Sequence, residues 1–388
     1  MLVIAGKNNI AVKAFNYIFD HYGKDFLVVV NKTETGEHGW QRSLRKTAIE
    51  KGVREVTLDE AYDLATIFFS LEFDMLVKPE KFRNAQAYNI HFSLLPKYKG
   101  MYTSLWPILN GEAFSGVSLH KIDQGIDTGD LIDQITIPIL DHDRAIDLYM
   151  KYLDAGFKLF KANIKKIYQQ NYSARQQPSH ESSYYSKSSI DFDNIKIDLN
   201  QTADRIKRQI YAFSFREFQL AVVHDEKVVE VKILDNKSVE KPGCIIHKSS
   251  RYFDISTIDF DLRLYLDGIE NIYEFAECDI SRAEELLSHL CGVNDCDENG
   301  WSPLIIAAYS GNLKVMKFLV KSGANVNAVN NNGTSVLMYA KDFALKNKDK
   351  RGFDFLVQNN ANINHQDFSG RQLSDYISQS EADFLGLE

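Results

Sequence analysis

Cysteine is scarce in this 388-residue chain, and a long apolar run is missing. The four cysteines, Cys244, Cys278, Cys291 and Cys296, form no CxxC pair and are too few for a disulfide framework, so we expect a reduced, cytoplasmic protein. Three of them cluster with His289, but at spacings that fit no common zinc pattern, so we expect no metal site. No apolar run reaches the roughly 18 residues that span a bilayer, so we expect no membrane segment.

An excess of basic residues is also missing, since the formal net charge is −8. Nucleic acids and anionic membranes both need a cationic face, so neither is an expected partner. Residues 271–388 carry −6 of the charge. The first residues, MLVIAGKNNIAVKAF, have no basic leader and contain polar residues, which favours a first strand over a signal peptide. They also match neither GxGxxG nor a P-loop, so no nucleotide cofactor is expected there.

Residues 1–149 alternate short apolar runs with longer amphipathic ones, which predicts strands alternating with helices. The expected strands are MLVIAG, FLVVVN, ATIFFS and AYNIHFS, and VKAFNYIFDHYG is an expected helix. Such alternation predicts a parallel α/β sheet with its site at the carboxyl ends of the strands. Residues 150–190 begin as a helix and then become polar, as in a linker or a segment that wraps the surface.

Residues 191–267 contain one helical stretch, LNQTADRIKRQIYAF, followed by β-rich runs split by turns. Beyond them a period of 33 residues separates Gly300 from Gly333 and resembles ankyrin repeats, with one full repeat, one expanded repeat and partial caps at 272–291 and 367–377. We therefore expect a Rossmann-like α/β domain over residues 1–190, a small β-rich domain over 191–267 and α-helical ankyrin repeats over 268–388.

The residues with the clearest chemistry are Asn89 and His91, which lie two apart on an expected strand and so share one face. An amide beside an imidazole can stabilise an oxyanion and move a proton in acyl transfer. Asp127, 38 residues after Asn89, lies in a glycine-punctuated stretch that can return its carboxylate to the strand end, where it would orient the imidazole. The residue types alone leave a purely structural Asn and His as the alternative.

The segment NIHFSLLPKYKG at 89–100, with GIDTGD at 125–130, resembles the folate-dependent formyltransferases over roughly residues 1–190. The resemblance implies an α/β formyltransferase fold, 10-formyltetrahydrofolate as co-substrate, no metal, and Asn89, His91 and Asp127 as the catalytic residues. It implies attack of an amine on the formyl carbon, with the oxyanion held by Asn89 and protonated His91. Whether His91 or Asp127 takes the amine proton stays open. The residues implied beside the folate are Ser93, Leu94, Leu95, Pro96, Phe69, Ser70, Leu71, Asp123 and Asp130.

The resemblance to formyltransferases leaves open which molecule accepts the formyl group. Relatives that formylate methionyl-tRNA must bind a polyanion, which the charge disfavours, and the purine-pathway relative is a short single domain. The stretches at 39–46, 69–74, 89–112 and 211–220 resemble sugar-nucleotide N-formyltransferases. That resemblance implies a dTDP-linked amino-dideoxy sugar, made for bacterial lipopolysaccharide such as O-antigen. The first choice is dTDP-3-amino-3,6-dideoxyglucose, with the 4-amino isomer as the alternative.

A pyrophosphate needs cationic or donor side chains, and a thymine needs an aromatic face. The candidates for these contacts are Trp40, Gln41, Lys78, Tyr211, Phe213 and Arg216. Each of them alone also fits a core or solvated residue.

The repeats extend an expected homodimer or cap the β-rich domain, because so short an array leaves apolar ends to cover. Alternatively Trp301, at a turn tip where repeats usually carry a polar residue, stacks on a second nucleotide sugar or contacts another protein. A non-catalytic scaffold also stays open, although a scaffold has no need of Asn89, His91 and Asp127 together.

Overall fold

The computed structural model describes residues 1–290 and 292–387, so Cys291 lies outside the described residues. The chain forms two compact units. Unit 1 comprises Met1–Asp198 with Asp204–Ala221, and unit 2 comprises Leu199–Ala203 with Val222–Glu388. Residues 204–221, which the sequence groups with the β-rich region, thus belong to unit 1. The division into three domains stays a prediction.

Unit 1 is built on a six-stranded sheet with the order β2-β1-β3-β4-β6-β7. Its strands are β1 (Leu2–Gly6), β2 (Phe26–Val30), β3 (Ile67–Leu71), β4 (Gln86–His91), β6 (Phe114–Lys121) and β7 (Leu131–Pro138). The first four are parallel, as expected from their apolar runs. β6 and β7 are antiparallel, so the sheet is mixed. A short loop joins these two strands, whereas a parallel pair needs a long crossover.

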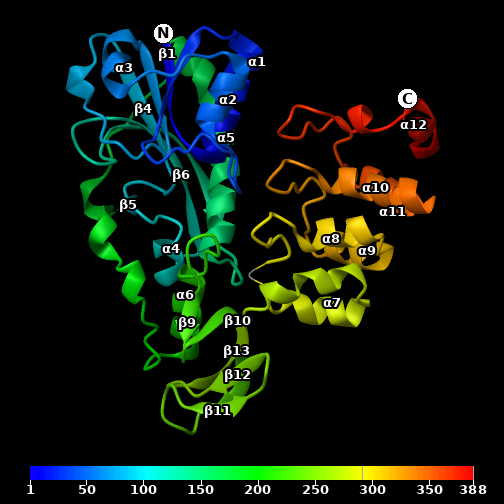
Figure 1. The fold of residues 1–388 in the computed structure, drawn as a ribbon. Helices are drawn as coiled ribbons and strands as arrows, with labels where there is room; N and C mark the ends of the chain where they lie inside the picture. Colours follow the sequence, from blue (N-terminus) through cyan, green and yellow to red (C-terminus); the bar gives the residue numbers. More distant parts are fainter. Residues whose placement is uncertain (291, 388) are drawn as a thin grey trace. The chain divides into compact units, whose positions relative to one another are not determined.

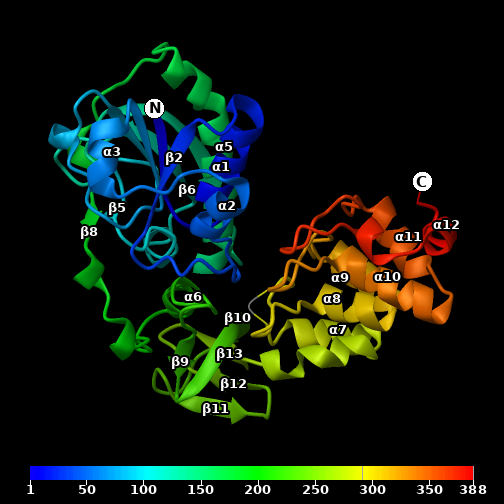
Figure 2. The ribbon, with the colours of Figure 1, turned by 45° about the horizontal axis from the view of Figure 1, so that its top comes forward.

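Helices cover both faces of this sheet (Figures 1 and 2). α1 (Asn8–Tyr22) and α5 (Ala145–Tyr168) pack together on one face, and α3 (Leu58–Leu64) lies on the other. The buried residues of α1 recur at helical spacing, which gives it one apolar side. Gly156 lets α5 approach closely, since a Cβ there would lie 2.8 Å from Cδ1 of Ile10. The shorter helices of this unit are α2 (Leu44–Lys51), α4 (Trp106–Leu109) and α6 (Ala203–Ala212), with 3₁₀ turns at Pro79–Lys81, Ser179–Glu181, Lys187–Ser189 and Phe192–Asn194.

The polar segment after α5 wraps back over unit 1. Arg175 forms a β-bridge with Leu131, and β8 (Tyr184–Tyr185) pairs in parallel with β5 (Lys99–Gly100). The surface-wrapping alternative offered by the sequence therefore describes residues 175–185, which lie against the loops that follow β4 and β6.

Unit 2 begins with a five-stranded sheet of order β11-β12-β13-β10-β9. The strands are β9 (Ala221–Val223), β10 (Glu226–Lys237), β11 (Ile245–Lys248), β12 (Tyr252–Ile255) and β13 (Phe260–Leu266). Its buried positions include Val228, Phe253 and Leu264. These strands confirm the β-rich region expected from the sequence.

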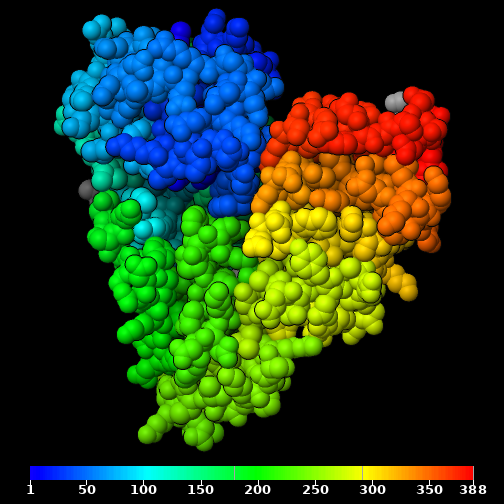
Figure 3. Space-filling view, viewed as in Figure 1, coloured from blue at the N-terminus to red at the C-terminus, as the bar shows by residue number. Residues whose placement is uncertain are grey.

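The rest of unit 2 is a stack of helices (Figure 1) that share one apolar core. Its successive segments form layers coloured from yellow to red in Figure 3. The helices are η5 (Ile269–Ala276), α7 (Ile280–Leu287), α8 (Pro303–Ser310), α9 (Leu313–Lys321), α10 (Val336–Asn347), α11 (Arg351–Gln358), η6 (Leu373–Tyr376) and α12 (Gln379–Leu385). Ser302 and Ser335 cap equivalent helices one repeat apart, as the 33-residue period requires. The expected ankyrin fold is confirmed. No helix in the described part of the chain is long and apolar enough to cross a membrane.

Candidate active site

The end of β4 presents Asn89 and His91 on one face of the sheet. β4 pairs with β3 on one side and β6 on the other, and the β6 register sets His120 opposite Asn89 and Ser118 opposite His91. His91 and His120 are 8% and 2% exposed. Strand pairing alone therefore brings an amide and two imidazoles together at the edge of the sheet, all within unit 1.

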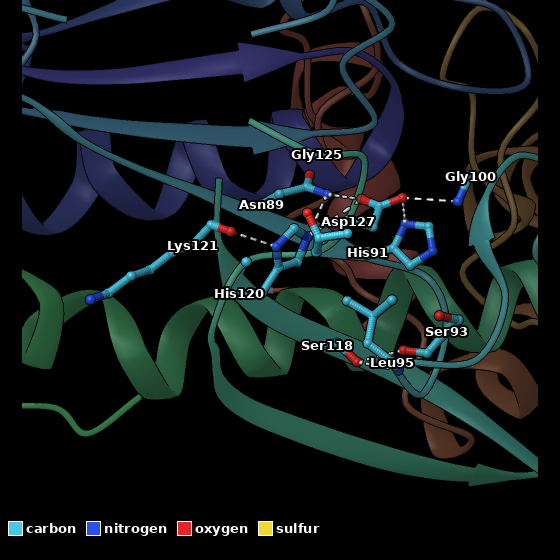
Figure 4. Close-up of polar contacts among 12 residues, drawn as sticks. Asn89, His91, Ser93, Leu95, Gly100, Ser118, His120, Lys121, Gly125 and Asp127 are labelled. Carbon is cyan, nitrogen blue, oxygen red and sulfur yellow. Dashed lines mark hydrogen bonds and ion pairs between the residues drawn. The ribbon is translucent and has the colours of Figure 1, made fainter. Parts of the chain in front are cut away.

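Asp127 reaches this group from the loop between β6 and β7, with its backbone in the left-handed region at φ 56°. One carboxylate oxygen, Oδ2, accepts the Gly100 N–H at 2.9 Å and lies 3.4 Å from His91 Nδ1. The other, Oδ1, lies 3.3 Å from Asn89 Nδ2 and 3.5 Å from His120 Nε2. Figure 4 shows the four side chains converging on one point. The structure thus assembles the three residues predicted to be catalytic.

The charge of Asp127 follows from these neighbours. Burial raises its pKa, but the charge of His91, the hydrogen bond and charge of His120, and the Gly100 N–H outweigh burial and hold the pKa below its ordinary value. Asp127 is therefore ionised at neutral pH.

The two nitrogens of the His91 ring both face acceptors. Nε2 lies 2.8 Å from the Tyr98 carbonyl oxygen, and Nδ1 faces the Asp127 carboxylate. Each ring nitrogen of His91 therefore has an acceptor within reach. Charged His91 is the state that an oxyanion beside it requires.

His120 belongs to the same group, although our sequence analysis did not include it. Its Nδ1 lies 2.7 Å from the Lys121 carbonyl oxygen, and its Nε2 lies 3.1 Å from Asn89 Nδ2 and 3.5 Å from Asp127 Oδ1. Ser118 and His120 alternate on β6 in the same way as Asn89 and His91 on β4, but only the pairing of the two strands sets His120 opposite Asn89.

The loop predicted beside the folate is held by β6 and β7. Ser118 Oγ donates to the Ser93 carbonyl at 2.6 Å and accepts the Leu95 N–H at 3.0 Å. Gln134 Nε2 donates to the Leu95 carbonyl at 3.0 Å. Leu94 packs over Gly116, and the Leu95–Pro96 peptide is cis. This loop directly follows His91, so its fixed backbone forms one wall of the site.

The other residues predicted beside the folate divide into core and loop positions. Phe69 and Leu71 are fully buried, and the Phe69 ring packs on Tyr88 and Phe160, so these two side chains belong to the core. Ser70 is the β3 residue in register with Asn89.

In the loop after β6, Asp123 Oδ1 accepts from Thr128 Oγ1 at 2.6 Å and from Gly125 N–H at 3.1 Å. The Asp130 carbonyl accepts the Lys121 N–H. These two residues shape the loop that carries Asp127.

The residues predicted to contact the sugar nucleotide are only partly brought together. Trp40 is 40% exposed and lies against Tyr149, Phe215 and Phe218, with ring centroids 5.8–6.2 Å apart. Gln41 is buried, and its Nε2 donates to Tyr149 Oη. Phe215, Phe218 and Tyr149 were not in our predicted set, because a single aromatic carries no signal in a sequence.

The other four candidates lie elsewhere in unit 1. Tyr211 is 2% exposed, with Arg144 and Lys207 over its ring, so it is a core residue. Lys78 is exposed at the start of the 3₁₀ turn after β3. Phe213 and Arg216 are partly buried in the loop after α6.

A carboxyl group that the sequence did not single out follows β3. Glu72, at φ 55°, accepts from Tyr149 Oη at 2.8 Å and from Asn8 Nδ2 at 3.3 Å. Burial raises its pKa to about 7, and the bonds from Tyr149 and Asn8 oppose that shift. This group ties the start of α1 to the end of β3.

In unit 2, the Trp301 ring packs edge-on against Tyr309 and at a tilt against Tyr339, with centroids 5.5 and 4.7 Å apart. Tyr309 is 55% exposed. Among the described residues of both units, no group of three or more His, Cys, Asp or Glu side chains is placed to hold a metal ion.

Comparison with known proteins agrees with this geometry. Residues 75–164 match the formyl transferase family and residues 275–367 match ankyrin repeats. Curated relatives include the methionyl-tRNA formyltransferases of Clostridium tetani, 33% identical over 44% of this chain, and of Clostridioides difficile, 32% identical over 44%. The chain spans only about 55% of the length of these relatives.

Two solved structures match much more of their own length. WlaRD, a sugar 3N-formyl transferase in the presence of dTDP and 5-N-formyl-THF, is 42% identical with a TM-score of 0.64, over 68% of this chain and 97% of its own. The N-formyltransferase of Helicobacter canadensis in complex with folinic acid and dTDP-3-aminofucose is 43% identical with a TM-score of 0.64, over 68% and 98%.

These matches make the chain a folate-dependent N-formyltransferase by class. Within that class it belongs to the sugar N-formyltransferases, here followed by ankyrin repeats.

Proposed function

We propose that this protein transfers the formyl group of 10-formyltetrahydrofolate to the amino group of a dTDP-linked amino-dideoxy sugar, with dTDP-3-amino-3,6-dideoxyglucose as the first candidate. The observation that carries the proposal is the cluster of Asn89, His91 and Asp127 at the end of β4. Its support is the identity of 42–43% with two enzymes whose structures contain dTDP or a dTDP-3-amino sugar. A product of this kind belongs to bacterial lipopolysaccharide synthesis.

In the proposed reaction, the acceptor nitrogen bonds to the formyl carbon, the bond from that carbon to N10 of the folate breaks, and the amine proton ends on N10. An amide donor and an imidazolium suit a carbonyl oxygen that becomes an oxyanion. Asn89 and His91 meet Asp127 at 3.3 and 3.4 Å, which is long for N–H···O bonds. Exchanging such a bond for a shorter one to the oxyanion therefore costs little.

The proton of the amine has two possible acceptors in the site, as the sequence already suggested. Asp127 is ionised and within 3.5 Å of both histidines, so it is the resident base, and protonated His91 is the resident acid. We propose that Asp127 receives the proton and that His91 delivers one to the leaving nitrogen, after which the two exchange it.

For the acceptor, Trp40 with Phe215 and Phe218 offers the aromatic face that a thymine needs. Lys78 and Arg216 stay candidates for the pyrophosphate. The loop of Ser93 to Pro96, with Ser70, Asp123 and Asp130, is the proposed folate contact. A homodimer in the cytoplasm completes the proposal, and light scattering of the purified protein tests the dimer.

The test is a mass-spectrometric assay with 10-formyltetrahydrofolate and a panel of acceptors. The panel contains dTDP-3-amino and dTDP-4-amino dideoxy sugars, UDP-amino sugars and methionyl-tRNA. We expect formylation of a 3-amino sugar at a kcat/KM above that of the other acceptors. Preference for the 4-amino isomer would reject the first candidate, and formylation of methionyl-tRNA alone would favour the function of the curated relatives.

For Trp301 we propose a second ligand site in the repeats, with a nucleotide sugar as the ligand. The half-exposed cluster of Trp301, Tyr309 and Tyr339 supports it. Binding stoichiometry of a dTDP-sugar by calorimetry should fall from two to one per chain in Trp301→Ala. An unchanged stoichiometry would reject the site.

A further inference from the structure

The segment from Arg175 to Tyr185 contacts both loops that surround the catalytic cluster. On one side, Arg175 and Leu131 exchange two backbone hydrogen bonds, each 2.8–2.9 Å long, next to the loop that carries Asp127. On the other side, Ser183 accepts the Tyr98 N–H at 2.8 Å through Oγ and the Lys99 N–H at 2.9 Å through its carbonyl. We refer to residues 175–185 as the strap.

Gln177 is the strap residue that reaches the Asp127 loop through its side chain. Its Nε2 donates to the Asp127 carbonyl at 2.8 Å and to the Gly129 carbonyl at 2.7 Å. The amide orientation is settled, because the reverse orientation would set Oε1 against both carbonyl oxygens. Both N–H groups of this amide are thus committed to one short stretch of backbone.

The oxygen of the same Gln177 amide, in contrast, is not hydrogen-bonded among the described residues. This atom, Oε1, is buried. A buried oxygen without a partner lowers the stability of the fold, so stability alone does not account for this placement. The placement is instead explained if Gln177 serves to hold the backbone carbonyls of Asp127 and Gly129 through its Nε2.

The Asp127 loop needs such a hold. Asp127 has φ 56°, which a residue with a side chain adopts at a cost, and glycines stand two residues away on each side. Its carboxylate contacts with Asn89, His91 and His120 are 3.3–3.5 Å long, so its one short bond is the 2.9 Å bond from the Gly100 N–H. The short bonds from Gln177 to the Asp127 and Gly129 carbonyls constrain it from the opposite side.

We infer that Gln177 is a positioning residue, which fixes the Asp127 carboxylate against His91 and His120 by clamping the backbone of its loop. The inference rests on the proposed function for its catalytic consequence, but not for its structural one. Ser183 acts in parallel on the facing loop, where the Tyr98 carbonyl meets His91 and the Gly100 N–H meets Asp127.

The structural consequence is tested by hydrogen exchange on the full-length chain. We expect amides of residues 123–130 to exchange at least about tenfold faster in Gln177→Leu than in the wild type, with the β1 to β4 amides unchanged. Gln176→Leu is the matched control, because Gln176 is exposed and its side chain forms no hydrogen bond among the described residues. Gln177→Met replaces the leucine variant if that variant does not fold. Equal exchange in this loop for all variants would overturn the inference.

The catalytic consequence is tested by steady-state kinetics of the same variants. Gln177→Leu should lower kcat about 10- to 100-fold with KM within about threefold, because a displaced carboxylate affects the reaction more than binding. Gln177→Glu offers no donor when ionised and one when protonated, so its kcat relative to wild type should rise as the pH falls from 8 to 5. A kcat of Gln177→Leu within twofold of wild type, or a pH-independent ratio for Gln177→Glu, would overturn it.

These two tests separate the inference from the proposed function. If the wild type formylates no acceptor in the panel, the proposed function fails, and hydrogen exchange alone still decides whether Gln177 holds the loop.

Discussion

Asp127 shows how much of this site depends on single contacts. Its carboxylate meets a backbone N–H, an amide and two imidazoles, and these partners come from three separate stretches of chain. The Asn89 and His91 spacing could be predicted, because alternation on a strand is a local property. His120 was missed because its importance depends on the β4–β6 register, which no local pattern reveals.

The two histidines should differ in the size of their effects. His91→Ala should lower kcat about 10²- to 10⁴-fold with the folate KM within about threefold, since His91 faces the reacting carbonyl. His120→Ala should lower kcat only about tenfold, because it acts through Asn89 and Asp127. The exposed His142→Ala is the control in steady-state assays. A larger loss of kcat in His120→Ala than in His91→Ala would show that His120, and not His91, faces the reacting carbonyl.

The same contacts determine how the contribution of Asp127 to the free energy of unfolding depends on pH. The pKa of Asp127 is lowered in the folded chain. Its contribution to the free energy of unfolding is therefore present above the pKa of the unfolded chain, and it is lost as the pH falls through the pKa of the folded chain. Between pH 5 and 8 Asp127 therefore adds no slope to the free energy of unfolding, and a slope in that range has another origin.

Glu72 contributes a slope in that range, opposite in sign to that of His38, whose pKa burial lowers to about 4. Its pKa is raised from 4.5 to about 7, so the folded state binds its proton more tightly and stability falls as the pH rises across that range. For a fully enclosed carboxyl group, this pKa shift changes the free energy of unfolding by about 3 kcal/mol. Because Glu72 is partly exposed, we expect a change of about 1–2 kcal/mol. In urea unfolding, the free energy of unfolding of wild type relative to Glu72→Gln should fall as the pH rises from about 5 to 7. Glu80→Gln, at an exposed position, should keep the wild-type slope, and a parallel profile for Glu72→Gln would contradict the assignment.

At the scale of elements, strands β1 to β4, helix α1 and the β-rich region follow from apolar runs and periodicity, and the ankyrin helices follow from the repeat spacing. Strands β6 and β7 were not predicted. The polar segment after α5 has no periodicity, so the sequence offered a linker or a wrapping segment and left its contacts open. The antiparallel turn from β6 to β7 was also hidden, since a buried strand reads the same in either direction. Both features are set by pairing with distant residues.

Gly116 tests how β6 supports the loop after β4. A Cβ there would lie 2.2 Å from the Ile135 carbonyl oxygen and 2.6 Å from Leu94 Cδ2. Gly116→Ala must therefore push Leu94 outward, and we expect a loss of about 1–3 kcal/mol in unfolding free energy together with weaker folate binding. Gly39→Ala, where no heavy atom lies within 4 Å, should be nearly neutral in both measurements. An unchanged folate affinity in Gly116→Ala would show that this loop does not contact the folate.

For the whole molecule, the proposed chemistry and the repeats belong to different units. Every residue of the catalytic cluster, the strap and the aromatic group around Trp40 lies in unit 1, and the helices from η5 to α12 share a core of their own. The two similar sugar N-formyltransferases match 68% of the chain and nearly all of themselves, so their own lengths leave little room for a repeat array.

Removal of residues 268–388 should therefore leave formyl transfer in place. We expect kcat within about threefold of the full chain, because the strands and loops that hold Asn89, His91 and Asp127 are intact. Thermal unfolding should lose the transition of the repeat core, and Leu337→Ala in the full chain should lower that transition alone, by about 2–5 kcal/mol, since Leu337 is 1% exposed. A truncated chain that folds, binds folate and yet loses kcat more than 100-fold would show that the repeats contribute to catalysis itself.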